Sequence, residues 1–229
     1  MIANSMYAVT TTEALTTVPL YILMGEILLR SSSITVLFAQ IDKLVSGIRG
    51  RQFHMALTLS AILGAPAGSG IAVAAMLGRS LMRPMLARGY DRQLTAGVMM
   101  GGALLAPIIP PSVLAIIIGT IADVSIADLL ISGIIPGIVL TGLYVAIVAY
   151  KVWRNPALAP VETYVAPSRR EKLIALARTI PFSLIIFVSV GLIMVDFATA
   201  SEAAALGVLA ALLESFWYRK MGWRDYLQA

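Results

Sequence analysis

Seven apolar runs, separated by short polar segments, dominate this sequence and limit the environments in which it can fold. They occupy residues 15–29, 53–63, 70–82, 94–122, 129–150, 180–195 and 203–218. Hydrophobic residues make up 59% of the chain and charged residues only 13%, so lipid is the expected solvent for most of it. A bilayer core of about 30 Å takes roughly 20 helical residues. We therefore expect an all-α integral membrane protein with several transmembrane helices.

The charges between the apolar runs predict how the chain is oriented in the membrane. Lys and Arg occur just before residue 53, again between residues 79 and 92, in 151–178 and after residue 218, whereas 119–128 and 196–202 contain neither. By the positive-inside rule, the N-terminus lies outside and the C-terminus is cytoplasmic. The excess of 17 basic over 12 acidic residues thus reflects topology and a bilayer, not a nucleic-acid partner. The absence of cysteine excludes disulfides, thiolate metal sites and a cysteine nucleophile.

Two adjacent runs, 53–63 and 70–82, are too short to cross a bilayer and are joined by the sequence GAPAGS. Eleven helical residues extend about 16 Å, roughly half the hydrocarbon thickness. We predict a re-entrant helical hairpin over residues 53–88, which turns near the middle of the membrane and leaves by the face it entered. Two full crossings would fit the charges equally well, and the length of the runs favours re-entrance.

The next run is long enough to span but contains PIIPPS at residues 107–112. Each proline lacks a backbone donor and clashes with the preceding helical turn, so we predict a helix over 93–122 that is broken into two halves. Irregular backbone at membrane depth is tolerated only where it is buried in protein or lines a watery cavity. Two breaks in consecutive elements therefore indicate one shared polar chamber.

The ends of the half-helices at these breaks predict a binding site. Carbonyl-rich helix C-termini, before Gly64 and before Pro107, favour a cation, and amide-rich N-termini, after Gly68 and after Pro111, favour an anion. Such a pair of broken helices is typical of a site that holds a cation beside a carboxylate. Glycine and proline also kink membrane helices simply for packing, but a re-entrant turn followed at once by PIIPPS favours the binding site.

Ser69 and Ser112 fall at or near the N-caps of the new half-helices, where a hydroxyl could cap the helix or bind an ion or substrate. A rival hypothesis pairs Ser69 with the single histidine, His54, as an intramembrane serine protease. No GxSxG pattern occurs, and His54 is expected at the hairpin mouth, about half a membrane from Ser69. HExxH and phosphate-loop patterns are absent too, so an enzyme is not expected.

The remaining segments have simpler predicted roles. Residues 34–48 alternate apolar and polar positions at helical spacing, which predicts an interfacial helix. The spacings from Ser168 to Glu171 and from Thr199 to Glu202 fit capping boxes. Glu26, the acidic residue inside an apolar run, lies one turn from Arg30, so a helix-pairing or snorkelling role is expected.

Several stretches closely resemble the large membrane subunit of TRAP transporters, the tripartite ATP-independent periplasmic carriers often called the DctM family. They are VPLYILMGEIL (18–28), GSGIAVAAMLGRSLMRPMLARGYD (68–91), IIPPSVLAIIIG (108–119), VSIADLLISGIIPG (124–137) and TASEAAA (199–205). Order and spacing match from about residue 5 onward. The chain departs from the family pattern at Ala67, where relatives usually have serine, and near Gly101 and Gly102, where they have small hydroxyl residues.

The resemblance implies a sodium-coupled secondary transporter of the elevator type that imports organic acids such as C4-dicarboxylates or sialic acid. It implies no cofactor besides the coupling Na⁺, and three partners: a periplasmic binding protein, a small four-helix membrane subunit and the carboxylate substrate. It also implies a bacterial or archaeal cytoplasmic membrane. Family sodium and substrate sites lie at the hairpin tip and the unwound helix. Together with the carbonyl-rich helix ends described above, this predicts Na⁺ near Gly64, Gly68, Ser69 and Pro110. The matching positions are Gly68, Ser69, Gly70, Pro110, Pro111 and Ser112.

The resemblance further implies which part of the transporter each segment of the chain forms. Residues 1–52 are expected to form a scaffold helix and the interfacial arm helix, and 53–122 the transport-domain element. A transmembrane helix at 129–150, a cytoplasmic linker with an amphipathic helix at 151–178 and a scaffold helical pair at 179–229 follow. Family proteins are nearly twice as long, so this sequence resembles their N-terminal half. Two alternatives remain: a non-transporting fragment or subunit that needs a second half, and another carrier of the wider ion-transporter superfamily.

Overall fold

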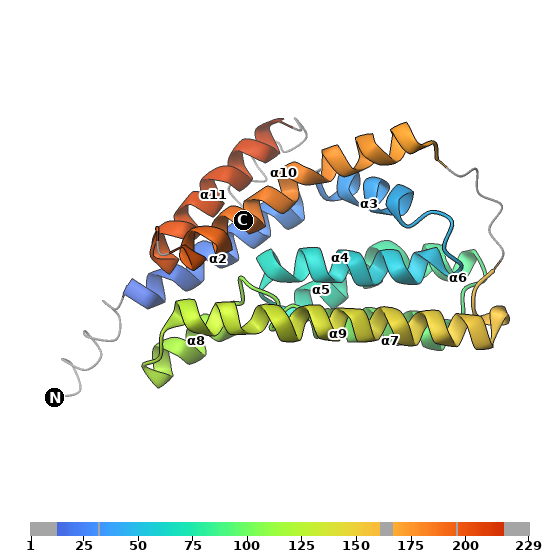
Figure 1. Ribbon diagram of the computed structural model, residues 1–229, viewed down its shortest axis with the longest axis horizontal. Helices are drawn as coiled ribbons and strands as arrows, with labels where there is room; N and C mark the ends of the chain where they lie inside the picture. Colours follow the sequence, from blue (N-terminus) through green and yellow to red (C-terminus); the bar gives the residue numbers. More distant parts are fainter. Residues whose placement is uncertain (1–12, 32, 161–166, 196, 218–229) are drawn as a thin grey trace.

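The structure is a computed structural model that describes residues 13–31, 33–160, 167–195 and 197–217, and its regular secondary structure in these ranges is helical (Figure 1). The elements are α2 (Glu13–Arg30), α3 (Ser33–Leu44), α4 (Arg51–Ala67), α5 (Gly70–Leu77), the π-helix η1 (Gly78–Met82), α6 (Arg83–Ala87), α7 (Arg92–Ala103), α8 (Val113–Ala122), α9 (Ile126–Arg154), the 3-10 helix η2 (Pro156–Leu158), α10 (Arg169–Met194) and α11 (Ala200–Trp217). The predicted all-α membrane fold is confirmed. Both chain ends, and hence the predicted sides of the termini, lie outside the described residues.

Two of the described helices, α9 and α10, are long and apolar enough to cross a membrane. The pair formed by α2 and α3 adds a third candidate if the two bent helices are counted as one span. Much of the apolar surface of α9 and α10 faces outward, including Ile135 and Phe187, which are 74% and 73% exposed. Such surface fits a lipid environment, where exposed apolar side chains carry no hydrophobic penalty.

The helices fall into two groups that lie one above the other in Figure 1. One group contains α2, α3, α10 and α11, and the other contains α4 to α9. In the first group the hydroxyls of Thr17 and Ser201 are 2.5 Å apart, and Gly207 packs against Met24 and Ser189. The contacts therefore advance along both helices in the same direction, from Thr17 to Met24 on α2 and from Ser201 to Gly207 on α11. The two helices run parallel, as the charge pattern predicts for two segments entering from the same face.

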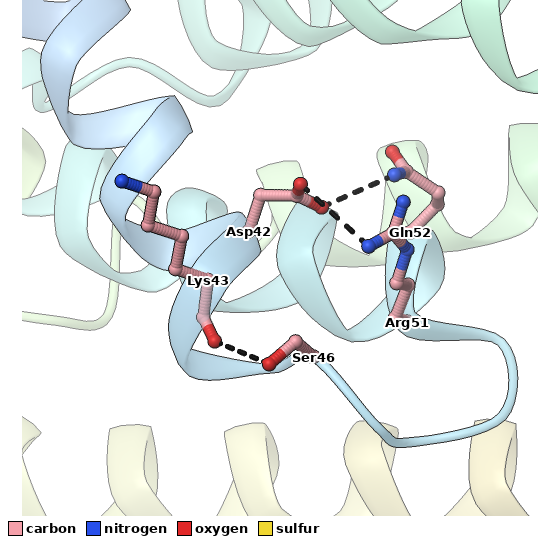
Figure 2. Close-up of polar contacts among 5 residues, drawn as sticks. All are labelled: Asp42, Lys43, Ser46, Arg51 and Gln52. Atoms are coloured by element: carbon pink, nitrogen blue, oxygen red, sulfur yellow. Dashed lines mark hydrogen bonds and ion pairs between the residues drawn. The ribbon is translucent and has the colours of Figure 1, made fainter. Parts of the chain in front are cut away.

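The two groups are joined by the turn between α3 and α4. Gly47 and Gly50 have φ values of 92° and 72°, a left-handed conformation that glycine adopts without steric cost. Across this turn, the carboxylate of Asp42 accepts a hydrogen bond from Gln52 at 3.3 Å and lies 3.8 Å from the guanidinium of Arg51 (Figure 2). Helix α3 is bent 71° from α2 and ends at Leu44, earlier than the interfacial helix predicted over 34–48.

The first arm of the hairpin is longer than the sequence pattern predicts. Helix α4 continues through Gly64 to Ala67, so its 17 residues extend about 25 Å instead of 16 Å. The prediction of a helix end before Gly64 is therefore wrong. In lipid a helix keeps its internal hydrogen bonds wherever it can, because no water is available to replace them, and this favours helix even through Gly and Pro.

Helix α10 also differs from its prediction, since the amphipathic segment that ends the linker and the apolar run 180–195 form one continuous helix. Its start matches the expected capping box: Glu171 accepts from the Ser168 amide at 2.7 Å, and Ser168 accepts from the Glu171 amide at 3.2 Å. The same reciprocal bonds join Thr199 and Glu202 before α11.

Candidate functional site

The hairpin tip is a two-residue turn between α4 and α5. Gly68 has φ +56°, and its amide donates to the Gly64 carbonyl at 3.0 Å, which closes the C-terminus of α4. The Ser69 side chain accepts from the Ala72 amide at 3.4 Å and caps the N-terminus of α5. The predicted role of Ser69 at an N-cap is confirmed, while Gly64 lies inside the helix, one turn before the tip.

The second interruption separates α7, which ends at Ala103, from α8, which begins at Val113. Ser112 lies at the N-cap of α8, as predicted, and is 1% exposed. Its hydroxyl donates to the Pro107 carbonyl at 2.7 Å and accepts from the Ala115 amide at 3.2 Å. One buried side chain thus satisfies a carbonyl at the start of the break and an amide at its end.

The two interruptions are in direct contact, as the sequence predicts. A Cβ atom added to Gly64 would lie 2.9 Å from Cα of Ala106. One added to Gly68 would lie 2.5 Å from Cγ2 of Val113, and one added to Gly70 would lie 2.7 Å from the Ala103 carbonyl oxygen. The tip therefore needs glycine at these positions so that its backbone can approach the backbone of the break.

Helix α9 encloses the break from another side, and the sequence analysis did not predict this contact. A Cβ atom on Gly133 would lie 2.5 Å from the Ile108 carbonyl oxygen, and one on Gly137 would lie 2.9 Å from Cγ1 of Ile109. The two glycines are four residues apart, so they share one face of α9. Their small-xxx-small spacing is the signal that could have identified this packing surface.

A cleft of about 600 Å³ opens between the hairpin tip and the broken helix. Gly68, Ser69 and Gly70 line it on one side, and Pro107 and Val113 line it on the other. Ser69 is exposed in it, and the lining residues carry no charged side chain. Most of its lining is apolar, unlike the shared polar chamber that the sequence predicted, and its polar groups are the Ser69 hydroxyl and backbone atoms.

The remaining predicted site residues lie outside this cleft. Pro110, Pro111 and Ser112 are buried behind it. Pro110 instead lines a second cavity of about 660 Å³ between α4, α9 and α10, which is almost entirely apolar. Of the six residues carried over from the family pattern, three line the cleft and three are buried outside it.

The structure gives no support to a pairing of Ser69 with His54. They lie near opposite ends of α4, about 22 Å apart along the helix axis by its rise per residue. His54 is 5% exposed and is therefore buried within the protein, near the start of α4. In the described part of the chain no group of three or more His, Cys, Asp or Glu side chains is arranged to hold a metal ion.

Comparisons with known proteins identify the family of the chain. The whole chain, residues 1–229, matches the family model described as the tripartite ATP-independent periplasmic transporter, DctM component. It is 28% identical over 208 residues to a C4-dicarboxylate TRAP transporter large permease protein of Pseudomonas aeruginosa, covering 89% of this chain and 47% of the relative. It is 36% identical over 125 residues to a sialic acid TRAP transporter permease protein of Haemophilus influenzae, covering 54% of this chain and 20% of the relative.

A third relative, an ectoine/5-hydroxyectoine TRAP transporter large permease protein of Ruegeria pomeroyi, is 28% identical over 93% of this chain and 49% of its own length. The chain thus spans about half the length of the curated relatives that it matches over most of its residues. These relatives are permeases, so the expectation that the chain is not an enzyme is confirmed. The protein belongs to the DctM family of TRAP transporter large membrane subunits.

Proposed function

We propose that this chain forms the hairpin and broken-helix half of a sodium-coupled permease that imports organic acids. The observation that carries the proposal is the contact between the glycines of the hairpin tip and the backbone of the break, beside a cleft of about 600 Å³. The relatives named for C4-dicarboxylate and sialic acid support a carboxylate as substrate.

Sodium would bind where backbone carbonyls gather at the end of α4 and around the break. A cation here needs carbonyl and hydroxyl ligands, because the cleft contains no carboxylate. Ser69 supplies an exposed hydroxyl, and Gly70 and Ile71, whose amides begin α5 and have no acceptor within the helix, line the cleft. The carboxylate of the substrate would bind at these amides. Sodium bound first would order the two loops and thereby raise the affinity for the carboxylate.

The two helix groups fit the elevator motion that the family resemblance implies. The group from α4 to α9 would be the transport domain, and α2, α10 and α11 would belong to the scaffold. The partners would be a periplasmic binding protein, a small four-helix membrane subunit and the remaining part of the transporter. The membrane would be the cytoplasmic membrane of a bacterium or archaeon, with the N-terminus outside and the C-terminus in the cytoplasm.

Uptake measurements test this function. The full-length transporter, reconstituted in vesicles with its small subunit and binding protein, should accumulate labelled C4-dicarboxylate or sialic acid only when a sodium gradient is present. Replacing the exposed hydroxyl by Ser69→Ala should raise the sodium concentration needed for half-maximal uptake. Ser132→Ala is the matched control, because Ser132 is an exposed serine on α9 whose hydroxyl donates to its own helix. Sodium-independent uptake would refute the coupling.

A further inference from the structure

Basic segments that are distant in the sequence meet at one end of the helix group that contains the hairpin. A side-chain nitrogen of Arg49 donates to the Pro156 carbonyl at 3.4 Å. The amide of Asp91 donates to the Leu158 carbonyl at 3.0 Å. Both acceptors lie in or beside η2, which directly follows α9. The short helix η2 therefore holds three basic segments together: residues 49–51, 88–92 and 151–154.

The surface formed by these segments is exposed and positively charged. We define the η2 basic surface by four exposed side chains: Arg49, Arg92, Lys151 and Arg154. The acidic residue among these segments is Asp91, and its carboxylate accepts the Leu94 amide at 2.7 Å as the N-cap of α7. That bond fixes Asp91 within its own helix start. The four basic side chains thus outnumber the one carboxylate on this surface.

Aromatic residues show at which depth of a membrane this surface lies. Tyr150 and Trp153 occupy the last turns of α9, are 60% and 75% exposed, and have ring centroids 6.2 Å apart. Exposed Trp and Tyr at the end of a spanning helix are typical of the interface between hydrocarbon and headgroups. One and two turns earlier on α9, Ile147 and Leu143 are 50% and 52% exposed, as lipid-facing residues are. The basic side chains therefore lie at headgroup level.

We propose that the η2 basic surface binds anionic phospholipids. The phosphate would be held by the guanidinium groups of Arg92 and Arg154, and the acyl chains would follow the exposed face of α9. Lys and Arg beside a membrane attract anionic headgroups, and arginine forms paired hydrogen bonds with phosphate oxygens. An adjoining apolar and aromatic face favours a lipid over a soluble anion. The proposal is independent of sodium coupling and of the transported substrate.

Quenching of Trp153 fluorescence by brominated lipids tests the proposal. Trp217 and Trp223 are replaced by Phe so that Trp153 is the remaining tryptophan of the 3 in the chain. The protein is reconstituted in bilayers with either brominated phosphatidylglycerol or brominated phosphatidylcholine. Phosphatidylglycerol should quench at the lower mole fraction, and each of Arg92→Gln and Arg154→Gln should reduce this preference about fivefold. Arg178→Gln, an exposed charge on α10, is the matched control and should leave the preference unchanged.

The outcomes separate the proposal from its alternatives. Equal quenching by both lipids, or a preference that survives the Arg92→Gln/Arg154→Gln double variant, would overturn it. Inorganic phosphate, compared with sodium chloride at equal ionic strength, should not displace the lipid. Displacement by phosphate would assign the surface to a soluble anion and would also overturn the proposal. Circular dichroism of each variant establishes that the fold is retained.

Discussion

At the scale of single residues, Gly68 is a position where the structure does not tolerate a side chain. Its φ of +56° disfavours other residues, and an added Cβ would lie 2.5 Å from Val113 Cγ2. Gly68→Ala should therefore lower the free energy of unfolding by roughly 2 kcal/mol or more. At Gly78, φ is −58° and nothing lies within 4 Å of an added Cβ, so Gly78→Ala should be neutral or slightly stabilising. Thermal unfolding in detergent compares the stability of the two variants, and an equal loss of stability in both would contradict the prediction.

Ser112 and Ser69 both cap helices, but their surroundings predict unequal effects. Ser112→Ala removes the buried hydroxyl that bonds Pro107 and Ala115, and it leaves the Pro107 carbonyl without its hydroxyl donor. The expected loss of stability is about 2 kcal/mol. Ser69→Ala removes an exposed cap whose bond is 3.4 Å long, and about 1 kcal/mol or less is expected. Denaturation of both variants measures the difference, and a larger loss for Ser69→Ala would be inconsistent with the geometry.

The sequence predicts which residues interrupt the helices, but not which way their side chains point. A serine before a short apolar run indicates an N-cap, so Ser69 and Ser112 could both be identified. Burial of Ser112 behind the cleft depends on how α7, α8 and α9 fold around the break, and no local pattern encodes it. The glycine contacts of α9 depend in the same way on a neighbour distant in sequence.

At the scale of elements, the polar contact across the turn between α3 and α4 should hold these helices at their observed angle. The side chains of Arg51 and Asp42 are only 11% and 29% exposed, so water screens their attraction less than at an open surface (Figure 2). A double-mutant cycle of Asp42→Ala and Arg51→Ala should give a coupling energy of about 1 kcal/mol. In the matched cycle, Asp42→Ala with Lys43→Ala should give none, because the Lys43 ammonium points away from Asp42 (Figure 2). Equal coupling energies in the two cycles would show that Asp42 does not interact specifically with Arg51.

Element boundaries were the least predictable part of the fold. The hairpin, the proline break and the capping boxes follow from local chemistry, which a single sequence displays. Helix α4 nevertheless runs four residues past the predicted end at Leu63, and α10 joins two segments that were expected to be separate. For α4, the lack of water in the bilayer favours unbroken backbone hydrogen bonding more strongly than helix propensities measured in water suggest.

At the scale of the whole molecule, the sequence does not predict which distant helices pack against each other. Nearly every run is apolar on all sides, so periodicity does not show which face is buried in protein and which faces lipid. The alternation of basic and non-basic loops restricts the direction in which each helix crosses the membrane. It requires α2 and α11 to cross in the same direction. Only the structure shows that these two helices, one near each end of the described chain, pack against each other.

The parallel packing of α2 on α11 gives a prediction about two helices that are distant in sequence. Thr17 and Ser201 are 184 positions apart in sequence, yet their hydroxyl oxygens are 2.5 Å apart. Because the chain has no cysteine, Thr17→Cys with Ser201→Cys introduces the only thiols, and mild oxidation should join them. In the control pair Ile22→Cys with Leu209→Cys, the native side chains are 51% and 56% exposed, so both thiols should stay free. Maleimide labelling after oxidation distinguishes the two, and full labelling of the Thr17/Ser201 pair would mean that the first and last described helices do not pack in this register.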